Sequence, residues 1–298
     1  MKKIICVFLL ATSLFGQSAG NSGLAFLKFG FGARNVALSD LGVVGTNDLT
    51  ALNYNPADLA AEKNNQLLFT HNSLFTDLSA EMFGASFNLW GLPLALGINT
   101  TNISDIEVRT TPGPAEATFS AHYFNGSIST AHEIAGNLYA GVTFKYLYEN
   151  MYSDDAEGYG FDIGLTYQKL VEGLNLGASV RNLGSMNILR SESTKLPADL
   201  LIGASYNFAM PDSKFDFTVL TGLQKYTLED GSHFHIGGEA VYNNMFALRA
   251  GYVGGYDSKS LTTGFGIKWI GLNLDYAYVP VKYGLGDSHI ITFIYTFE

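Results

Sequence analysis

Charged residues are scarce in this sequence of 298 residues, because Asp, Glu, Lys and Arg make up 15% of it, against roughly 25% in soluble globular domains. Proline is also rare, at 7 residues, and there is a single cysteine. The 17 lysine and arginine residues are outnumbered by 27 acidic residues, which gives a net charge of -10. This charge excludes a nucleic-acid-binding protein, which would need a basic face to displace counterions.

Hydrophobic residues, by contrast, make up 47% of the chain, aromatic residues make up 13%, and there are 33 glycines. This composition rules out a disordered chain, a collagen and a coiled coil. The length allows one large domain or two ordinary ones.

The first residues have the pattern of a secretory signal peptide, predicted to cover residues 1–19. Lys2 and Lys3 precede an apolar run from Ile4 to Leu10, and small or polar residues follow from Ala11 to Gly20. The apolar run is far shorter than the roughly 20 residues that a spanning helix needs, so we expect it to be cleaved.

The single cysteine, Cys6, lies inside this apolar run, with no lipobox before it. The mature protein is therefore expected to have neither a disulfide nor thiol chemistry, and a lipid anchor is not predicted. No later segment has about 18 consecutive apolar residues, so any membrane span must be a β-strand.

From Gln66 to the C-terminus the residues alternate with a period of two, as in β-strands. In the last strand Ile291, Phe293, Tyr295 and Phe297 share one face. Similar alternation runs through residues 159–167, 174–180, 265–269 and 272–278, and further strands are predicted to begin near Gln66, Glu81, Leu94, Phe119, Leu138, Leu200, Phe215, Phe234 and Phe246. The pattern predicts an all-β protein, a transmembrane antiparallel β-barrel of about fourteen strands, formed by residues 66–298.

The connections between these strands alternate between short and long, which is typical of outer-membrane barrels. The predicted short turns are 90–93, 135–137, 170–173, 210–214, 243–244 and 270–271, and the predicted long connections are 102–118, 150–157, 184–197, 226–232, 254–260 and 280–288. The chain is thus predicted to lie in the outer membrane of a Gram-negative bacterium, surrounded by its lipid, with short turns and both termini in the periplasm.

A soluble all-β protein is the competing class, but its non-core strand face would carry many charges. Here the polar strand positions are mostly Gly, Ser, Thr and Asn, and aromatic residues concentrate near strand ends, as in an aromatic girdle. A β-propeller would need repeats of about 40 residues, and the sequence shows none.

A sparse set of charges lies on the strand face opposite the aromatic residues. Its members are Lys145, Asp162, Arg181, Asp216, Glu239, Arg249, Lys268 and Asp275. Because charges are costly in lipid, we expect these side chains to point into the lumen. Their signs along the chain allow several adjacent strands to pair opposite charges across the barrel wall. A structural network is favoured over a substrate track, since buried charges need partners in either case.

Residues 20–65 lack sustained alternation and are predicted to form an N-terminal hatch or plug that folds back into the lumen. Asn55 before Pro56 is a good helix start, since Asn caps free N–H groups and Pro suits the first helical position. The alternative is a periplasmic extension with no role in the lumen.

A family resemblance rests on two motifs in this segment. Gly32-Ala33-Arg34 is followed by Ala37-Leu38-Ser39-Asp40, and then by a second motif at residues 53–60, Asn-Tyr-Asn-Pro-Ala-Asp-Leu-Ala, which contains Asn55, Pro56 and Ala57. Together they resemble the N-terminal signature of the PorV/PorQ family of outer-membrane proteins, within the wider group of FadL-like barrels. The resemblance implies a fourteen-stranded barrel and a non-enzymatic role in type IX secretion, in which PorV-like members receive the C-terminal domains of secreted cargo. It implies no cofactor.

The outer loops at 102–118 and 184–197 are the natural surface for such cargo or for other type IX secretion proteins, because loops on a rigid barrel carry variable recognition.

The alternative function is a FadL-like channel for hydrophobic solutes, in which the N-terminal segment gates the path and a strand defect opens sideways into lipid. Leu147, Leu201, Leu220 and Val241 are inward residues that could line its apolar pocket. The inward charges argue for a polar lumen, which places this function second. The inward glycines also have a purely structural interpretation, since small residues leave room for the hatch.

An enzyme is the least favoured class. None of the six histidines, His71, His122, His132, His233, His235 and His289, lies in a nucleophile motif. His233 and His235 share a strand face but have no evident third metal ligand, so we expect solvated histidines near an outer loop. Gly30-Phe31-Gly32 resembles the start of a dinucleotide fingerprint without its strand and helix context. No catalytic, cofactor or metal site is predicted.

Overall fold

The computed structural model describes residues 22–62, 64–74, 78–89, 91–210 and 213–297. The predicted signal peptide, residues 1–19, lies outside the described residues. Within the described part of the chain, no helix is long and apolar enough to cross a membrane.

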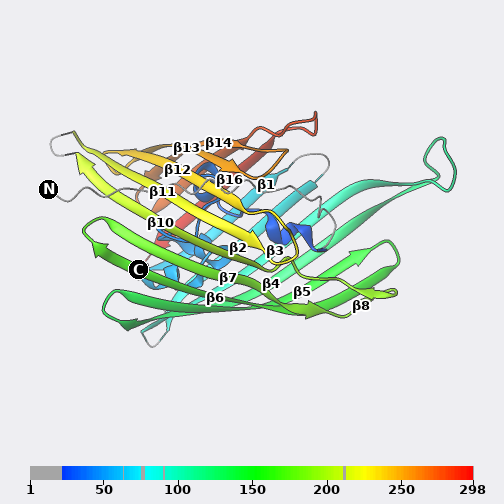
Figure 1. Ribbon diagram of the computed structural model, residues 1–298, viewed down its shortest axis with the longest axis horizontal. Coiled ribbons are helices and arrows are strands. Elements are labelled where there is room, and N and C mark those ends of the chain that lie inside the picture. The colour runs from blue at the N-terminus through cyan, green and yellow to red at the C-terminus, as the bar shows by residue number, and fades with distance from the viewer. Residues whose placement is uncertain (1–21, 63, 75–77, 90, 211–212, 298) are drawn as a thin grey trace.

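Fourteen antiparallel strands close into a barrel, in which the first strand pairs with the last (Figure 1). The strands are β1 (Asn65–Ser73), β2 (Leu78–Leu89), β3 (Leu92–Val108), β4 (Ala117–Ala135), β5 (Leu138–Met151), β6 (Asp154–Val171), β7 (Leu174–Met186), β10 (Asp199–Met210), β11 (Phe215–Tyr226), β12 (His233–Tyr242), β13 (Phe246–Gly254), β14 (Leu261–Trp269), β15 (Leu272–Val279) and β16 (Ser288–Phe297). The short strands β8 (Ile188–Leu189) and β9 (Glu192–Ser193) form a separate hairpin. The predicted fold class is confirmed.

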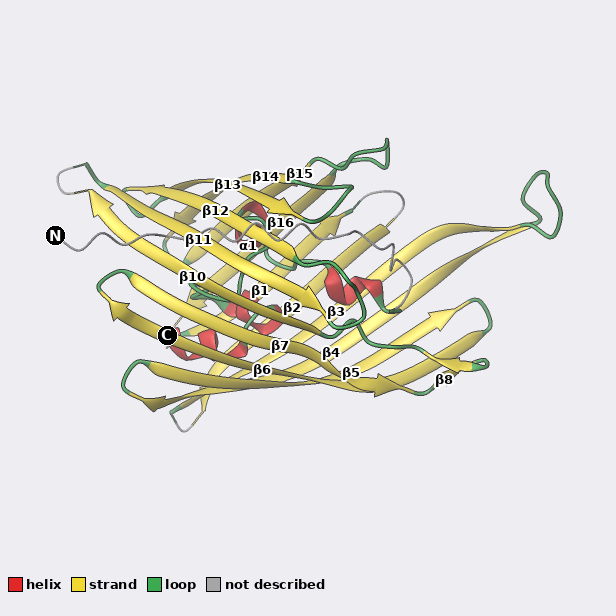
Figure 2. Ribbon diagram, in the orientation of Figure 1, coloured by secondary structure: helices red, strands yellow, loops and turns green. Residues whose placement is uncertain are grey.

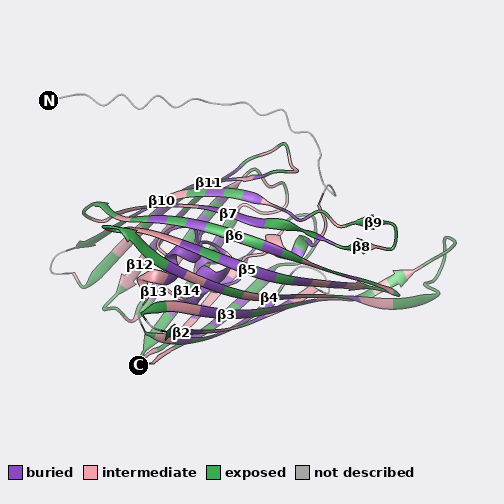
Figure 3. Cartoon of the chain, turned by 90° about the horizontal axis from the view of Figure 1, so that it is seen from below, coloured by how far each residue is buried: buried purple, intermediate pink, exposed green. Residues whose placement is uncertain are grey.

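The outer face of the barrel is apolar, as the alternation predicts. In β16, Ile290, Thr292 and Ile294 are at most 1% exposed, whereas Ile291 and Phe293 are 38% and 40% exposed. The same alternation of buried and exposed positions is visible along the other strands (Figure 3). An exposed belt of large apolar side chains is costly in water and favourable in hydrocarbon, so the barrel presents its outer wall as a membrane surface would require.

The short turns lie at one end of the barrel and the long connections at the other. Residues 243–245 join β12 to β13, and Asn243 and Asn244 have φ angles of 54° and 53°. Two successive positive φ angles define the type I′ turn, whose twist matches that of the flanking strands, and Asn tolerates this conformation better than most residues. Such turns leave little chain at this end, where β16 also finishes at Phe297.

Two predicted long connections are wrong in their bounds. The range 150–157 is strand except for Tyr152 and Ser153, because β5 continues to Met151 and β6 begins at Asp154. The range 102–118 is mostly strand, because β3 continues to Val108 and β4 begins at Ala117. The residues of β3 after Ile103 pair only with β4, and the residues of β4 before Ala121 pair only with β3. These residues form a two-stranded ribbon that projects past the barrel (Figure 1). The period-two pattern weakens there because neither face of a free ribbon is buried against a core.

The described N-terminal segment, residues 22–62 and 64, runs through the lumen (Figure 2). Its helices are η1 (Ala25–Lys28), α1 (Ala33–Ala37), η2 (Leu49–Asn53) and η3 (Pro56–Ala61). The α1 helix contacts β13 to β16, and η3 contacts β3 to β6.

The segment enters at the long-connection end, where the Gly23 N–H donates to the Lys195 carbonyl oxygen at 3.0 Å. It leaves at the short-turn end through Asn65 in β1. The prediction that the mature N-terminus is periplasmic concerns residues outside the described part, but the residues that follow lie at the end opposite Phe297.

Candidate functional site

Glycines on the inner wall form a belt against which the N-terminal segment packs. The glycine belt consists of Gly84, Gly97, Gly141, Gly164, Gly177, Gly203, Gly222, Gly237, Gly251 and Gly264, one on each of ten strands. Several face one another across neighbouring strands, as Gly141 faces Gly164 and Gly237 faces Gly251. A methyl group at Gly141 would collide with the backbone of Pro56 and Ala57. The segment therefore lies backbone to backbone against the wall, closer than any side chain would permit.

Asn55 anchors the second motif to the barrel. Its Nδ2 donates to the carbonyl oxygen of Val43 at 2.7 Å, to that of Leu165 at 3.1 Å and to Thr166 Oγ1 at 2.9 Å. Its Oδ1 accepts from the Ala57 N–H at 3.1 Å, so the predicted helix cap is confirmed, although η3 is a 3₁₀ helix. One buried side chain thus ties together two parts of the segment and strand β6.

Asp58, which follows in the same motif, is buried and receives neutral hydrogen bonds only. The Thr46 N–H donates to Oδ2 at 3.1 Å and the Thr166 hydroxyl donates to Oδ1 at 2.5 Å. Burial raises the pKa of Asp58 to about 7, more than these hydrogen bonds lower it. Asp58 was not singled out from the sequence, although its place two residues after Pro56 in the motif was a usable signal.

Arg34 of the first motif joins a network of charges on the barrel wall. Its guanidinium contacts Glu239 through two nitrogens, at 3.1 and 2.8 Å, and donates to the Gly45 carbonyl oxygen at 3.0 Å. Glu239 also pairs with Arg249 at 2.6 Å, and Arg249 pairs with Asp275 at 2.6 Å. Arg34 and Glu239 thus link the segment to the wall through a bidentate bond, the strong form of ion pair.

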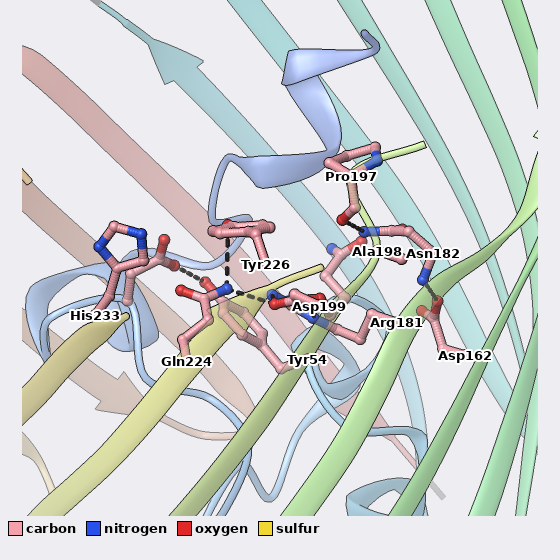
Figure 4. A network of polar contacts seen from close by, with 12 residues as sticks. Tyr54, Asp162, Arg181, Asn182, Pro197, Ala198, Asp199, Gln224, Tyr226 and His233 are labelled. Carbon is pink, nitrogen blue, oxygen red and sulfur yellow. Dashed lines mark hydrogen bonds and ion pairs between the residues drawn. The ribbon is translucent and has the colours of Figure 1, made fainter. Parts of the chain in front are cut away.

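A second network lies on β5 to β11 (Figure 4). Arg181 forms a bidentate pair with Asp199, at 3.0 and 2.6 Å, and donates through Nη1 to the Asn53 carbonyl oxygen at 2.7 Å. Gln224 donates to the same carboxylate. Asp199, absent from the predicted set, lies directly opposite Arg181 in the register of β7 and β10. Asp199 is the first residue of β10 and follows Pro197 closely. At a strand start the alternation is too short to predict that its side chain faces inward.

Lys145 and Asp162 complete this network with an ion pair of 2.7 Å. The predicted lumen charges therefore divide into two groups. Lys145, Asp162, Arg181, Glu239, Arg249 and Asp275 are buried in ion pairs, and Asp216 and Lys268 are exposed at the short-turn end. Solvent reaches both of the last two residues, and within the described part of the chain neither takes part in an ion pair.

Lys268 lines a vestibule of about 680 Å³ that opens at the short-turn end. Arg34, Glu239 and Asp275 form its inner wall, and Val241 lies on one side. Val241 therefore faces a polar, open space and does not contribute to an apolar pocket, in contrast to the prediction. The space ends where the networks and the N-terminal segment fill the lumen.

One side of the lumen at the long-connection end is apolar, beside the network of Arg181 and Asp199. Leu24 and Phe26 of the N-terminal segment, each 3% exposed, pack among barrel residues in what we name the outer apolar cluster. The barrel members of this cluster are Leu147, Ala156, Met186 and Leu196. The Phe26 ring lies 5.3 Å from that of Tyr123. Lys28 forms an ion pair of 2.6 Å with Glu229, half-buried at the edge of the cluster.

Leu201 and Leu220, two further inward residues of the predicted pocket, pack below this cluster. They contact Leu38, Leu41, Val43 and Val44 of the N-terminal segment and are 1% exposed. The two apolar clusters therefore lie beside the Arg181–Asp199 network between the long-connection end and the glycine belt, and the segment itself fills the space that they line.

The histidines of β12 are buried, so the prediction of solvated histidines is wrong for them. His235 Nδ1 lies 2.6 Å from the Ser39 carbonyl oxygen. The His233 ring stacks on Tyr256 with centroids 3.7 Å apart. Among the described residues no group of three His, Cys, Asp or Glu side chains is placed to hold a metal ion. His235 instead serves to hold the N-terminal segment against β12.

The barrel wall has a defect between β6 and β7. Phe161 pairs with Leu183 and Ile163 with Val180, so one residue on β6 faces two on β7. Asn182 has a φ angle of 58°, and its N–H donates to the Asp162 Oδ1 at 2.8 Å. At this β-bulge the Asp162 carboxylate, which also pairs with Lys145, takes the place of a backbone acceptor.

Comparisons with known proteins place this geometry among FadL-like barrels. A scan against protein-family models and a search of curated proteins found no match to this chain. Among solved structures, the toluene transporter TodX of P. putida is similar with a TM-score of 0.69 and 14% identity, over 90% of this chain and 99% of that chain.

Two further structures agree. The Ralstonia pickettii toluene transporter TbuX has a TM-score of 0.63 at 14% identity, over 90% of this chain and 99% of its own. A Pseudomonas aeruginosa FadL homologue has a TM-score of 0.58 at 10% identity, over 90% and 98%. These likenesses establish the FadL-like barrel fold. None of the three is a PorV or PorQ protein, so that part of the resemblance stays a prediction.

Proposed function

We propose that this chain is a non-enzymatic outer-membrane channel of the FadL type, which carries hydrophobic small molecules through its lumen. The observation that carries this proposal is the outer apolar cluster. There, Leu24 and Phe26 of the N-terminal segment occupy a site whose walls are apolar barrel side chains. A molecule that replaced them would meet the same apolar walls, and its burial would be favourable by about 25 cal/mol per Å².

The lumen charges do not oppose this function. The sequence favoured a polar lumen because eight charges face inward, but six of them are buried in ion pairs, in which Asp199 and Arg34 are further partners. The two that remain exposed, Asp216 and Lys268, lie at the short-turn end. The polar residues therefore brace the barrel and its N-terminal segment, and the outer apolar cluster beside them keeps an apolar lining.

The structural neighbours support the same class of solute. TodX and TbuX are toluene transporters by name, and this chain shares their fold over nine tenths of its length. A small aromatic hydrocarbon fits the outer apolar cluster, since Phe26 already presents a ring of that size there.

The route we infer begins at the long-connection end, when residues 22–28 leave the outer apolar cluster. The glycine belt and the Asn55 and Arg34 contacts hold the rest of the segment in place. The bulge at Asp162 and Asn182 interrupts the regular strand pairing of the nearby wall, and a sideways exit there leads directly into lipid.

Uptake by cells tests the proposal. A strain whose outer membrane lacks other channels of this class would be given the wild-type chain, and uptake of radiolabelled toluene and of a small sugar would be measured. We expect faster uptake of toluene and unchanged uptake of the sugar. Equal gains for both solutes would indicate a nonspecific pore, and no gain for toluene would exclude the proposed function.

A secretion component of the PorV/PorQ type is the second candidate, and the projecting β3–β4 ribbon favours it. The ribbon has two unpaired strand edges at the long-connection end, and such edges accept an extended segment of another protein. Purification from the native outer membrane, followed by mass spectrometry, separates the two functions. Secreted proteins with type IX C-terminal domains, lost when residues 104–120 are shortened, would favour secretion over solute transport.

A further inference from the structure

Glu149 is a buried carboxyl group without a basic partner among the described residues. It lies near the long-connection end of β5 and is 3% exposed. Its hydrogen bond comes from a neutral group, the Thr194 hydroxyl, which donates to Oε1 at 2.5 Å. The other buried carboxyl groups of the barrel wall each pair with an arginine or a lysine, namely Asp162, Asp199, Glu239 and Asp275. Burying a carboxyl group without such a partner is costly, so the position of Glu149 requires an explanation.

The strand register places this carboxyl group within the outer apolar cluster. Leu147, a member of the cluster, precedes Glu149 by two residues on the same inward face of β5. Glu149 lies directly opposite Ala156, another member, and directly opposite Tyr123, which packs against the cluster. Residues that face each other in this way have Cβ atoms about 4.5–5.5 Å apart. The cluster therefore contains one strong hydrogen-bond acceptor among its apolar walls.

The beginning of the N-terminal segment covers both neighbours of this carboxyl group. Gly23 packs directly on Thr194, since a methyl group at Gly23 would lie 2.2 Å from the Thr194 Cγ2. Phe26 packs on Tyr123, with the ring centroids 5.3 Å apart. The segment thus separates Glu149 from the long-connection end in the same way as it fills the apolar site.

We propose that Glu149 makes the channel selective for monoaromatic solutes that carry a hydrogen-bond donor, a hydroxyl or an amino group, over hydrocarbons of the same size. This inference rests on the proposed function, because residues 22–28 must leave the cluster before a solute enters it. A solute ring in the place of Phe26 lies beside Tyr123. Its donor then reaches the carboxyl group that faces Tyr123 across the strand pair.

The carboxyl group can accept this hydrogen bond in either protonation state. An ionised carboxylate has about four lone-pair sites on its two oxygens, and a protonated carboxyl group keeps acceptor capacity on its carbonyl oxygen. The Thr194 hydroxyl uses one of these sites, which leaves others for the solute. A hydrocarbon in the same place would keep water away from the carboxyl group and offer it no hydrogen bond in return.

A structural role for Glu149 is the competing explanation, since its bond to Thr194 holds the connection between β9 and β10 against β5. Loss of that bond would alter the heat resistance of the barrel and the uptake of all solutes to the same degree. It would not distinguish a solute that has a donor from one that lacks it.

Uptake of three matched solutes tests the inference in the strain described for the proposed function. Radiolabelled p-cresol is toluene with a hydroxyl group, and p-methylanisole carries the same oxygen without its proton. Uptake by the strain without the chain is subtracted from each value. Glu149→Leu should lower the ratio of p-cresol to toluene uptake about tenfold, as expected for one hydrogen bond to a charged group, without a matching fall in the ratio of p-methylanisole to toluene. Glu149→Gln, which keeps an acceptor oxygen, should retain most of the preference for p-cresol.

Asp216→Asn is the matched control. Asp216 is an inward carboxyl group that is exposed at the short-turn end, so its variant should keep the wild-type ratios. Equal p-cresol ratios in the wild type and Glu149→Leu, with toluene uptake intact, would overturn the inference and leave the proposed function standing. An equal loss of all three solutes in Glu149→Leu would overturn it in favour of the structural role. Absence of toluene uptake in the wild type would exclude the proposed function, and the inference with it.

Discussion

The N-terminal segment is held by two different kinds of interaction along its length. Its inner part, residues 33–61, lies against the glycine belt and is tied by Asn55, Arg34 and the Asn53 carbonyl oxygen. Its outer part, residues 22–28, is held by apolar packing, one backbone hydrogen bond and the Lys28–Glu229 pair.

The difference follows from what each kind of interaction requires. Buried hydrogen bonds and ion pairs are directional, so displacing the inner part would leave several polar groups unpaired, at about 1–3 kcal/mol each. Apolar packing has no direction, and another apolar molecule can replace it. We therefore expect the inner part to stay in place and the outer part to be displaceable by another apolar molecule.

Removing Arg181 should break the inner part most strongly. Arg181→Met leaves Asp199, which is fully buried, without its charge partner and frees the Asn53 carbonyl oxygen. We expect a loss of about 3–5 kcal/mol, because an unpaired buried charge is costly. The loss of stability is measured as the lower temperature at which the barrel unfolds in SDS. The double variant Arg181→Met with Asp199→Leu should recover most of the loss, and failure to do so would mean that the pair is not the cause.

A side chain at the glycine belt should push the inner part away from the wall. Gly141→Val places carbon atoms where the Pro56 and Ala57 backbone lies, at a cost of about 1–3 kcal/mol for overpacking. Limited proteolysis should then cut within residues 33–61. Gly238→Ala is the control, since nothing lies within 4 Å of the added methyl group. If residues 33–61 were equally protected from protease in both variants, the glycine belt would not be the surface against which the segment packs.

Raising the pH should loosen the inner part through Asp58. Its folded pKa is raised by burial from 3.8 to about 7, so the folded state binds the proton more tightly than the unfolded chain. The stabilisation is complete below pH 4 and is lost as the pH rises through 7. We expect lower heat resistance at pH 8 than at pH 5 in the wild type. Asp58→Asn should flatten this difference, and an unchanged slope would rule out Asp58 as its source.

The outer part should tolerate change with the smallest effect on the barrel. Phe26→Ala removes the ring from the outer apolar cluster, so residues 22–28 should become accessible to protease while the barrel keeps its heat resistance. Toluene uptake should rise. Phe265→Ala, on the exposed outer face, removes the same side chain from a lipid-facing site and should leave uptake unchanged. If Phe26→Ala lowered the heat resistance of the barrel as much as Arg181→Met does, the inner and outer parts would not differ in how they are held.

Much of the fold was predictable because strand alternation is a local property. A residue such as Phe293 is apolar, and its neighbour Thr292 is polar, whatever lies across the barrel. The Asn55–Pro56 cap was predictable for the same reason, since a cap forms between residues two or three apart. Strand ends were less certain, as the β3–β4 ribbon shows, because a free ribbon has no buried face to impose a pattern.

The site was predictable only in part, because pairing depends on register. The inward charges were identified from their faces, but the partner of Arg181 is Asp199, which lay outside the predicted set. Asp216 and Lys268 share the inward strand face but are exposed, since the distance of an inward residue from the lumen centre depends on strand length and tilt. The burial of His233 and His235 likewise depends on what packs against β12.

The sequence by itself determined that this chain forms a β-barrel preceded by an N-terminal segment outside the strand pattern. Hydrophobic periodicity is a property of neighbouring residues, so it can be read without knowledge of the tertiary structure. The tertiary structure alone decided how that segment is held. The glycines of ten strands become one belt only when the sheet closes, and Arg34 meets Glu239 across 205 residues of chain. Contacts of this kind depend on shear and closure, which no local pattern specifies.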